Sequence, residues 1–285
     1  MRLAHLILAH DKPAQLERLV KRLAHPDADI FIHIDGKVDI KPFTDLDLPQ
    51  GASFIKNRIS IRWADFSMMT ATLASFEEIM SSGKTYSHLN LLSGHDYPLK
   101  SAEVIHNFLS KNQGKTFMRY RSVEDEWQES WSRFTRYHFG DYNFPMKFRL
   151  QWVFNKLLPP RRLPNGLRAY GFSQWVTITP ECAQYTIDYL KNNPKVKRFF
   201  RQTWGVDELV FQTILMNSPL KDKVVNDHLR FIKFIPRACN PLTLTMENAE
   251  ALVSSNKFYA RKFNAEVDSR IFDYLDQTAD KEINK

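Results

Sequence analysis

The chain has 285 residues, enough for one large domain or two small ones. Its 43% hydrophobic and 25% charged residues are typical of a globular protein and exclude a disordered chain or a coiled coil. The formal net charge of +8 predicts an anionic partner, such as a nucleotide, a nucleic acid, an acidic glycan or an anionic lipid surface. Lys and Arg are spread along the chain instead of forming one stripe, which disfavours a nucleic-acid-binding module.

The two cysteines, Cys182 and Cys239, are far apart and outside any CxxC spacing. They predict neither a disulfide framework nor a zinc site, and they fit a reducing compartment. The apolar run Leu6–Ala9 is too short for a signal peptide, and no window approaches the length of a membrane span. We therefore expect a cytoplasmic protein, with room for a peripheral position on the inner face of the cell membrane.

The first third of the chain alternates between strand and helix patterns. Residues 3–9 form a nearly continuous apolar run, typical of a buried parallel strand. Pro13 then begins a helical stripe that ends at Leu23, and a second strand ends at Asp35. Further strands are expected near residues 53–55 and 88–92, with helices after Trp63 and after Ser101. This alternation predicts an α/β sheet.

The middle of the chain, residues 119–171, is rich in aromatic residues, Arg and Pro and has little periodicity. Such a region can build a binding surface or an aromatic packing insert, and the sequence leaves both open. Regular patterns return with a strand over 174–179 and a helix opened by Thr179 and Pro180. A strand over 229–235 and a helix over 246–254 complete the prediction.

The stretch Thr203–Met216 carries two neighbouring carboxylates, Asp207 and Glu208, where a helix is predicted to begin. The dipole and the free N–H groups of a first helical turn favour an ionised carboxylate. An ionised carboxylate can act as a general base. Acidic residues also collect in first turns merely to satisfy the helix, so both interpretations remain open from this stretch alone.

Several nucleotide-binding patterns are missing. The nine glycines never form GxG, so the dinucleotide fingerprint and the P-loop are absent, and there is no GxSxG elbow. The Asp-x-Asp pairs at residues 27–29 and 45–47 fall in predicted loops, and the pairs His33–Asp35 and His95–Asp96 make poor hard-metal sites. We therefore predict no catalytic metal and no other cofactor. Asp35 and Asp96 follow strands, where ligand binding and turn capping are both open.

Blocks in a fixed order reveal a resemblance. They are AHLILAHDKPAQLERLVKRL with FIHID, RWADFSMMTATLASFEEIM with HLNLLSGHDYPLKS, and finally YGFSQWVTIT, VDELVFQTIL and FYARKF. Over about residues 3–264 the set resembles the core-2/I-branching β-1,6-N-acetylglucosaminyltransferase family, glycosyltransferase family 14, in a bacterial-type form. The family also includes peptide O-xylosyltransferases.

The resemblance implies an α/β, GT-A-like nucleotide-diphospho-sugar transferase fold, with a mixed, mostly parallel central sheet flanked by helices. It implies one domain over residues 1–264, with a nucleotide-binding half at 1–118 and an acceptor and catalytic half at 119–264. Residues 265–285 are expected to form a C-terminal tail.

The implied activity is inverting, metal-independent transfer of a sugar, GlcNAc or xylose foremost, from a UDP-sugar to a hydroxyl of a glycan or glycolipid acceptor. Glu208 matches the family's catalytic base, and Lys262 matches its diphosphate-binding lysine. Asp35 matches the aspartate that contacts the nucleoside. The other implied donor contacts are Leu8, His10, Asp96 and Arg237, the last being only the nearest candidate for a second diphosphate ligand.

The resemblance also implies acceptor contacts in the aromatic and basic middle of the chain, where Trp can stack on sugar faces. The implied acceptor residues are Glu129, Trp131, Arg133, Arg136, Trp175 and Phe234. An anionic membrane surface is a further candidate partner, and no nucleic acid is expected. The alternative is a non-catalytic basic module that binds an acidic glycan or nucleic acid.

Overall fold

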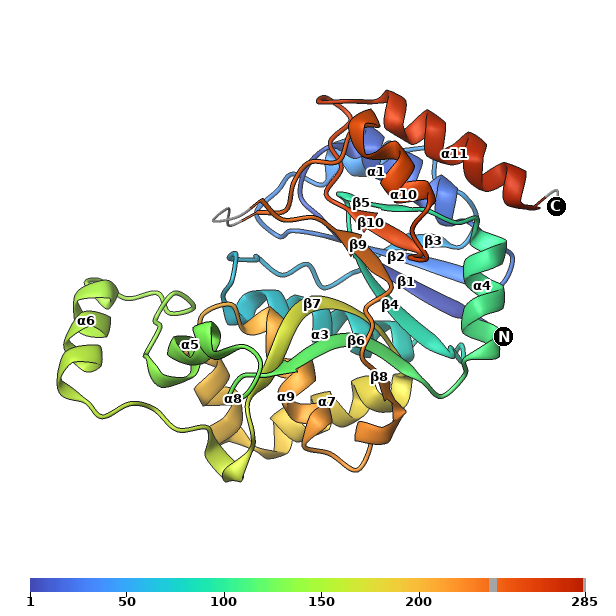
Figure 1. Ribbon diagram of the computed structural model, residues 1–285. Coiled ribbons are helices and arrows are strands. Elements are labelled where there is room, and N and C mark those ends of the chain that lie inside the picture. Colours follow the sequence, from blue (N-terminus) through green and yellow to red (C-terminus); the bar gives the residue numbers. More distant parts are fainter. Residues whose placement is uncertain (236–239, 284–285) are drawn as a thin grey trace. The chain divides into compact units, whose positions relative to one another are not determined.

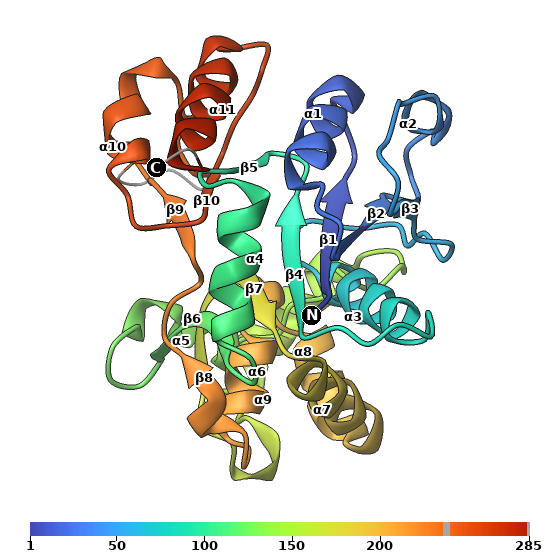
Figure 2. The same cartoon turned by 90° about the vertical axis from the view of Figure 1, so that its right-hand side faces the viewer.

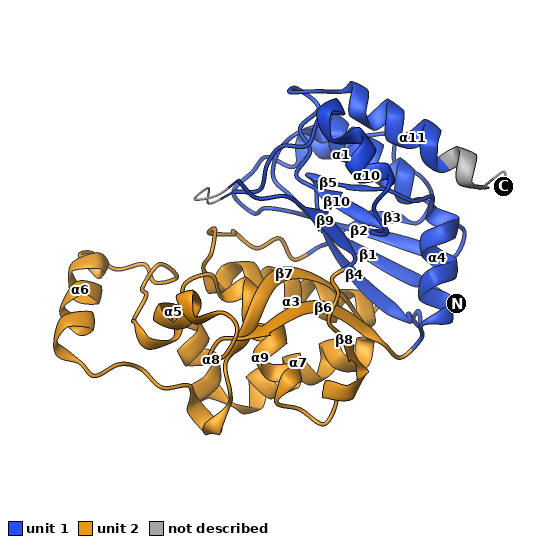
Figure 3. Ribbon diagram, in the orientation of Figure 1, with its two compact units in different colours: residues 1–56, 83–113, 229–285 blue, residues 57–82, 114–228 orange. Residues whose placement is uncertain are grey.

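The computed structural model describes residues 1–235 and 240–283 (Figure 1). It divides into two compact units (Figure 3). Unit 1 comprises residues 1–56, 83–113 and 229–285, and unit 2 comprises residues 57–82 and 114–228. The chain enters unit 2 at residue 57, returns to unit 1 at residue 83, enters unit 2 again at residue 114 and returns to unit 1 at residue 229. The division into halves at 1–118 and 119–264 stays a prediction.

Unit 1 is built on four parallel strands in the order β3-β2-β1-β4. They are β1 (Leu3–Ala9), β2 (Ala28–Ile34), β3 (Ala52–Phe54) and β4 (His88–Ser93). All seven residues of β1 are buried, as the apolar run predicts for a strand covered on both faces. β1 and β4 run side by side in the same direction (Figure 2). Helix α1 (Pro13–Leu23) joins β1 to β2 and buries the predicted stripe.

A second sheet in unit 1 has the order β5-β10-β9, formed by β5 (Asp96–Pro98), β10 (Tyr259–Arg261) and β9 (Arg230–Ile232). Besides α1, the helices of unit 1 are α2 (Lys41–Thr44), α4 (Ala102–Lys111), η5 (Met246–Asn248), α10 (Ala249–Val253) and α11 (Arg270–Ile283). Ser101 caps α4 by accepting a hydrogen bond from the Val104 N–H. The expected C-terminal tail, which begins at residue 265, contains helix α11, and Ile271, Phe272 and Leu275 of this helix are buried.

Unit 2 contains three strands in the order β7-β6-β8, namely β6 (Thr116–Ser122), β7 (Tyr170–Ile178) and β8 (Val224–Val225). β6 is antiparallel to β7 and parallel to β8. Its larger helices are α3 (Phe66–Met80), α5 (Trp131–Thr135), α6 (Lys147–Leu157), α7 (Pro180–Asn192), α8 (Pro194–Arg201) and α9 (Val210–Met216). Single 3-10 turns are η1 (Gln128–Ser130), η2 (Pro164–Gly166), η3 (Val206–Glu208) and η4 (Lys221–Lys223).

These pairings confirm the predicted α/β class with mixed, mostly parallel strands. Thr179 caps α7 through the Cys182 N–H, as its position before Pro180 predicts. Within residues 1–235 and 240–283, no helix is both long and apolar enough to span a membrane.

A polar network lies in the core of unit 1. His5 of β1 is buried and its Nδ1 lies 3.0 Å from the Asn90 amide nitrogen. The Asn90 amide oxygen accepts a hydrogen bond from Arg230, which also donates to the Leu91 carbonyl at 2.9 Å. Burial, and secondarily the Arg230 charge, lower the pKa of His5 to about 3. The imidazole is therefore neutral in the folded protein at physiological pH.

This buried histidine predicts a specific loss of stability in acid. The unfolded state binds a proton at His5 near the ordinary pKa of about 6.5, whereas the folded state resists it until about pH 3. The contribution is present above pH 6.5 and is lost as pH falls, by about 3 kcal/mol at pH 4. Denaturant titrations should show a flatter acid dependence for His5→Gln than for His10→Gln, whose imidazole is exposed. Equal slopes in the two variants would contradict the assignment.

Candidate functional site

Glu208 lies in the 3-10 turn η3, and not in the first turn of an α-helix as predicted. Leu209, with φ −124°, separates this turn from α9. The Glu208 N–H donates to the Gly205 carbonyl at 3.2 Å and the Leu209 N–H to the Val206 carbonyl at 3.0 Å. Because the turn is not continuous with α9, the helix-dipole argument for an ionised carboxylate does not apply here.

The Glu208 carboxylate is paired with Arg133, whose Nη1 lies 2.6 Å from Oε2. The guanidinium carbon lies 4.9 Å from the ring centre of Trp127 and 4.8 Å from that of Trp204. An arginine held against two indoles loses little further freedom when it pairs with a carboxylate. Arg133 was expected to contact the acceptor, and the structure brings it to the expected base.

Gly205 is required for this arrangement. It adopts the left-handed conformation, with φ +64°, and its N–H donates to the Ala64 carbonyl at 2.8 Å. A Cβ there would meet Arg133 Nη1 at 2.9 Å. Any side chain at Gly205 would therefore both strain the turn and displace the guanidinium.

The expected acceptor residues lie in different surroundings. Arg133, Arg136 and Trp204 share a cavity of about 220 Å³ in unit 2, closed by Tyr137, His138, Gln151 and Asn155 among others. Glu129 and Trp131 are exposed close by in the chain, in η1 and at the start of α5. Trp175 is buried within β7, and Phe234 belongs to unit 1, where it is exposed.

In unit 1, the ends of β1 and β2 bring together three expected donor contacts. The Leu8 carbonyl accepts from the Gly94 N–H at 3.0 Å, and the Ala9 carbonyl accepts from the Asp35 N–H at 2.9 Å. His10 is exposed immediately beyond β1. The Asp35 carboxylate accepts from the Lys37 N–H at 2.9 Å, as a turn-capping aspartate would. Ligand binding characteristically occurs at such an edge of parallel strands.

The same edge holds a cluster that the sequence did not reveal. His95 donates from Nδ1 to the Phe263 carbonyl at 3.1 Å, and its Nε2 lies 2.9 Å from Asp11 Oδ1. With His10, these groups place one ligand atom each within 4.8 Å of one another, so the trio could hold a divalent ion. The hydrogen bond with His95 lowers the pKa of Asp11. Asp11 and His95 are far apart in sequence, and only the fold brings them together.

Lys262 follows β10 and is half-buried. Its position is fixed through its neighbours. Gln15 of α1 donates to the carbonyls of Gly94 and Phe263, at 2.9 and 3.3 Å, and accepts from the Ala265 N–H. This glutamine links the edge of the parallel sheet to the segment that carries Lys262. Arg237, the expected second diphosphate ligand, lies outside the described residues.

Asp96 is fully buried and forms an ion pair with Arg261, at 3.0 Å, across the antiparallel pair β5 and β10. It also accepts a hydrogen bond from the Ser93 N–H at 3.1 Å. Burial raises the pKa of the Asp96 carboxyl against the opposing charge of Arg261. Asp96 is therefore linked to the segment of Lys262 through its ion pair with Arg261, the preceding residue. The sequence block FYARKF did not predict that Arg261 would be the partner of Asp96.

The family model for the core-2/I-branching enzyme matches residues 3–256. The chain therefore belongs to the core-2/I-branching enzyme family, which is a family of glycosyltransferases. This confirms the resemblance of the ordered sequence blocks.

Individual relatives are similar at low identity. Xylosyltransferase 2 of Rattus norvegicus is 25% identical over 299 residues, covering 97% of this chain and 33% of the relative. Xylosyltransferase 1 of Homo sapiens is 24% identical over 298 residues, covering 97% and 30%. The chain thus spans about a third of the length of these relatives. The structure of mouse xyloside xylosyltransferase 1 in its apo form covers 76% of this chain and 83% of its own, with a TM-score of 0.35 and 10% identity.

The buried pair of Asp96 and Arg261 generates a stability prediction. Asp96→Ala would leave a guanidinium with an exposed fraction of only 13% without its partner. Breaking a buried ion pair from one side costs about 3–5 kcal/mol, which denaturant unfolding would measure. Arg168→Gln, which removes an exposed pair, should change little. If Asp96→Asn instead kept full stability and lost UDP binding, a direct donor contact would replace the structural role.

Proposed function

We propose that the protein is an inverting, metal-independent glycosyltransferase, which moves a sugar from a UDP-sugar to a hydroxyl of a glycan or glycolipid. GlcNAc and xylose are the foremost donor sugars. Glu208 takes the proton of the acceptor hydroxyl while that oxygen attacks the anomeric carbon. The bond from that carbon to the diphosphate breaks, UDP leaves, and the anomeric configuration inverts.

The observation that carries the proposal is the Glu208 carboxylate, partly exposed and held by Arg133 in a rigid aromatic setting. A general base must be ionised, accessible and fixed in direction, and this carboxylate has a charged partner that fixes it. Asp207, its neighbour, is more deeply buried, which favours Glu208 of the two. The adjoining cavity with Arg136 and Trp204 offers cationic and aromatic groups of the kind that bind sugar hydroxyls and sugar faces.

On the donor side, the proposal assigns the nucleoside to Leu8, His10 and Asp35 and the diphosphate to Lys262. A lysine ammonium can stabilise the charge that develops on the leaving diphosphate, as a metal ion does in other transferases. Asp96 and Gln15 act as positioning residues for the segment around Lys262. Arg237 stays a candidate second diphosphate ligand. We expect no cofactor and no nucleic acid partner.

Replacement of the base is the main test. Glu208→Gln should lower transfer by about 100- to 10,000-fold, because the amide cannot accept the proton. UDP binding should be unchanged in isothermal titration calorimetry. A panel of UDP-sugars scored by UDP release first identifies the donor. Glu77→Gln, an exposed residue of α3, is the matched control and should retain activity. Turnover of Glu208→Gln at the wild-type rate would refute the assignment.

Metal independence has a separate test. Transfer should persist in excess EDTA, and Lys262→Gln should weaken UDP binding and turnover in the same buffer while Lys111→Gln does not. Loss of activity in EDTA with recovery on adding Mn²⁺ would overturn metal independence. If His95→Ala then abolished the recovery, the ion would be assigned to the cluster of His10, Asp11 and His95.

A further inference from the structure

A region of unit 2 has an unusual charge pattern. Between Asp141 and Glu181 the chain contains no acidic residue, while it contains six Lys and Arg residues. About half of this region forms α6 and its flanks, residues 144–162, which we call the α6 segment. It lies at the periphery of unit 2 (Figures 1 and 3).

One face of α6 attaches the segment to unit 2. Lys147 donates to the carbonyls of Gly140 and Tyr142 at 2.8 and 2.9 Å. The side chains of Gln151 and Asn155 bond to the backbone of residues 137–139. These polar contacts hold the helix without burying any of its residues.

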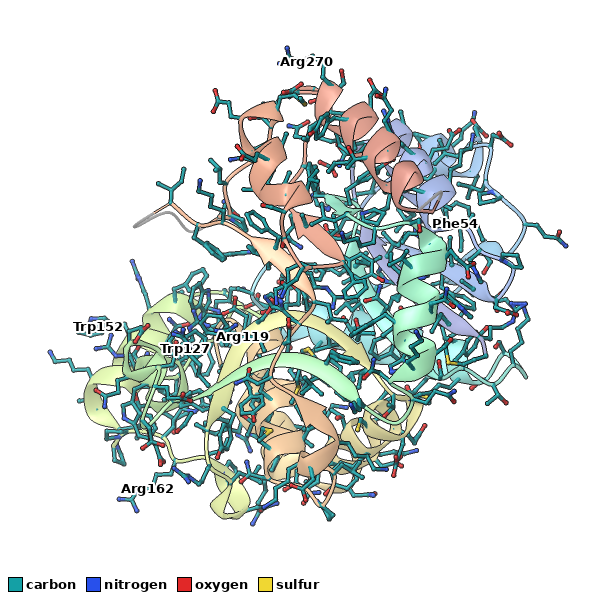
Figure 4. All side chains as sticks on the ribbon, turned by 45° about the vertical axis from the view of Figure 1, so that its right-hand side comes forward. Phe54, Arg119, Trp127, Trp152, Arg162 and Arg270 are labelled. Carbon is teal, nitrogen blue, oxygen red and sulfur yellow. The ribbon has the colours of Figure 1, made fainter. Side chains whose placement is uncertain are left out.

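The rest of the helix presents large apolar side chains to solvent. Phe148 and Trp152, one turn apart, are each 63% exposed, and Leu157 is 72% exposed. Met146, Leu150, Val153 and Leu158 add to the exposed apolar surface. Figure 4 shows Trp152 at the outer edge of unit 2. Phe148 and Trp152 share one face of the helix, because residues four apart lie one above the other. Exposed apolar groups of this kind mark an interaction surface.

Cations accompany these apolar groups. Arg149, Lys156 and Arg162 are exposed, and no carboxylate of residues 1–235 and 240–279 forms an ion pair with them. By contrast Arg168 pairs with Glu124 and Asp125, and Arg161 is buried against backbone carbonyls. Apart from Lys147 and Arg161, which bond to backbone carbonyls, the segment therefore keeps its positive groups exposed, as its large apolar groups are.

A cavity of about 490 Å³ adjoins the segment. Its lining combines aromatic side chains of residues 139–144 and Leu150 with Lys197, Arg198 and Arg201 of α8. Arg201 is paired with Asp141, so the two other cations of this wall supply the excess charge. An anionic group next to an apolar chain fits such a lining.

We propose that the α6 segment docks on a lipid bilayer that contains anionic lipid. Phe148 and Trp152, which share one face of α6, enter the boundary between headgroups and acyl chains, as basic and aromatic residues of interfacial helices do. Arg149, Lys156 and Arg162 lie against the lipid phosphates. The cavity of about 490 Å³ beside α8 binds a lipid headgroup. A second copy is disfavoured as occupant, because a two-fold contact would set this positive surface against itself.

The test uses the full chain and sucrose-loaded vesicles of phosphatidylcholine with phosphatidylglycerol. The wild type should co-sediment with these vesicles, weakly with phosphatidylcholine alone, and less at high salt. Phe148→Glu/Trp152→Glu and Arg149→Gln/Lys156→Gln/Arg162→Gln should each weaken binding by about tenfold or more. The controls change exposed residues elsewhere. Val267→Glu places a carboxylate at another exposed apolar position, and Lys41→Gln/Lys111→Gln/Lys221→Gln removes three positive charges, as the Arg149, Lys156 and Arg162 variant does. Both should bind like the wild type.

Brominated acyl chains provide an independent readout, since they should quench the fluorescence of Trp152 and this quenching should vanish in Trp152→Phe. No vesicle binding by the wild type, or equal loss in the charge control, would overturn the proposal. A dimer in sedimentation velocity that Phe148→Glu/Trp152→Glu dissociates, without vesicle binding, would assign the surface to a second copy and overturn it too. The inference rests on the glycolipid acceptor of the proposed function, but it is measured without sugar transfer, so either proposal can fail alone.

Discussion

The ion pair between Arg133 and Glu208 in unit 2 depends on a glycine turn and on two tryptophans beside the guanidinium. The guanidinium occupies the space that a side chain at position 205 would need, so the chain must turn there through a left-handed glycine. Trp127 and Trp204 cover it from two sides and restrict its rotation. A partly exposed carboxylate beside a mobile arginine would gain little from the pairing, because surface ion pairs lose side-chain entropy in forming. The aromatic walls remove that freedom in advance and give Glu208 one direction.

Unit 1 holds charged groups near the ends of β1 and β2, where a diphosphate is expected to bind. Asp96 and Arg261 form an ion pair in the interior. This leaves Lys262, the next residue, as the cation at the surface of the segment. Gln15 of α1 forms two hydrogen bonds with the backbone of the same segment and a third with the Gly94 carbonyl. A lysine side chain has many rotamers, so a rigid backbone beneath it lowers the entropy that binding would cost.

Regular elements were predictable because their signals are local. The apolar run of β1, the stripe of α1 and the caps Ser101 and Thr179 act within a few residues, and each appears as expected. The contacts of the candidate site could be predicted less well from the sequence. Glu208 was found through resemblance, while its pairing with Arg133 joins residues 75 positions apart. The helical stripe after Val210 also concealed the break at Leu209, since a 3-10 turn and an α-helical turn share similar residue spacing. Clusters such as His10, Asp11 and His95 depend on strand order, which no local pattern encodes.

The net charge of +8 acquires a more specific meaning once the cations are sorted by environment. Arg161, Arg230 and Arg261 are buried or nearly so and serve the fold by bonding carbonyls and a carboxylate. Their charge is neutralised or desolvated, and it contributes little to long-range attraction. Exposed cations without a carboxylate partner contribute more to long-range attraction. In the α6 segment such cations lie beside apolar side chains that are also exposed. Binding of a soluble anion would use only the positive charge. The apolar side chains favour binding only where the partner displaces water from them. The combination therefore selects an amphiphilic, anionic surface over a purely polar partner.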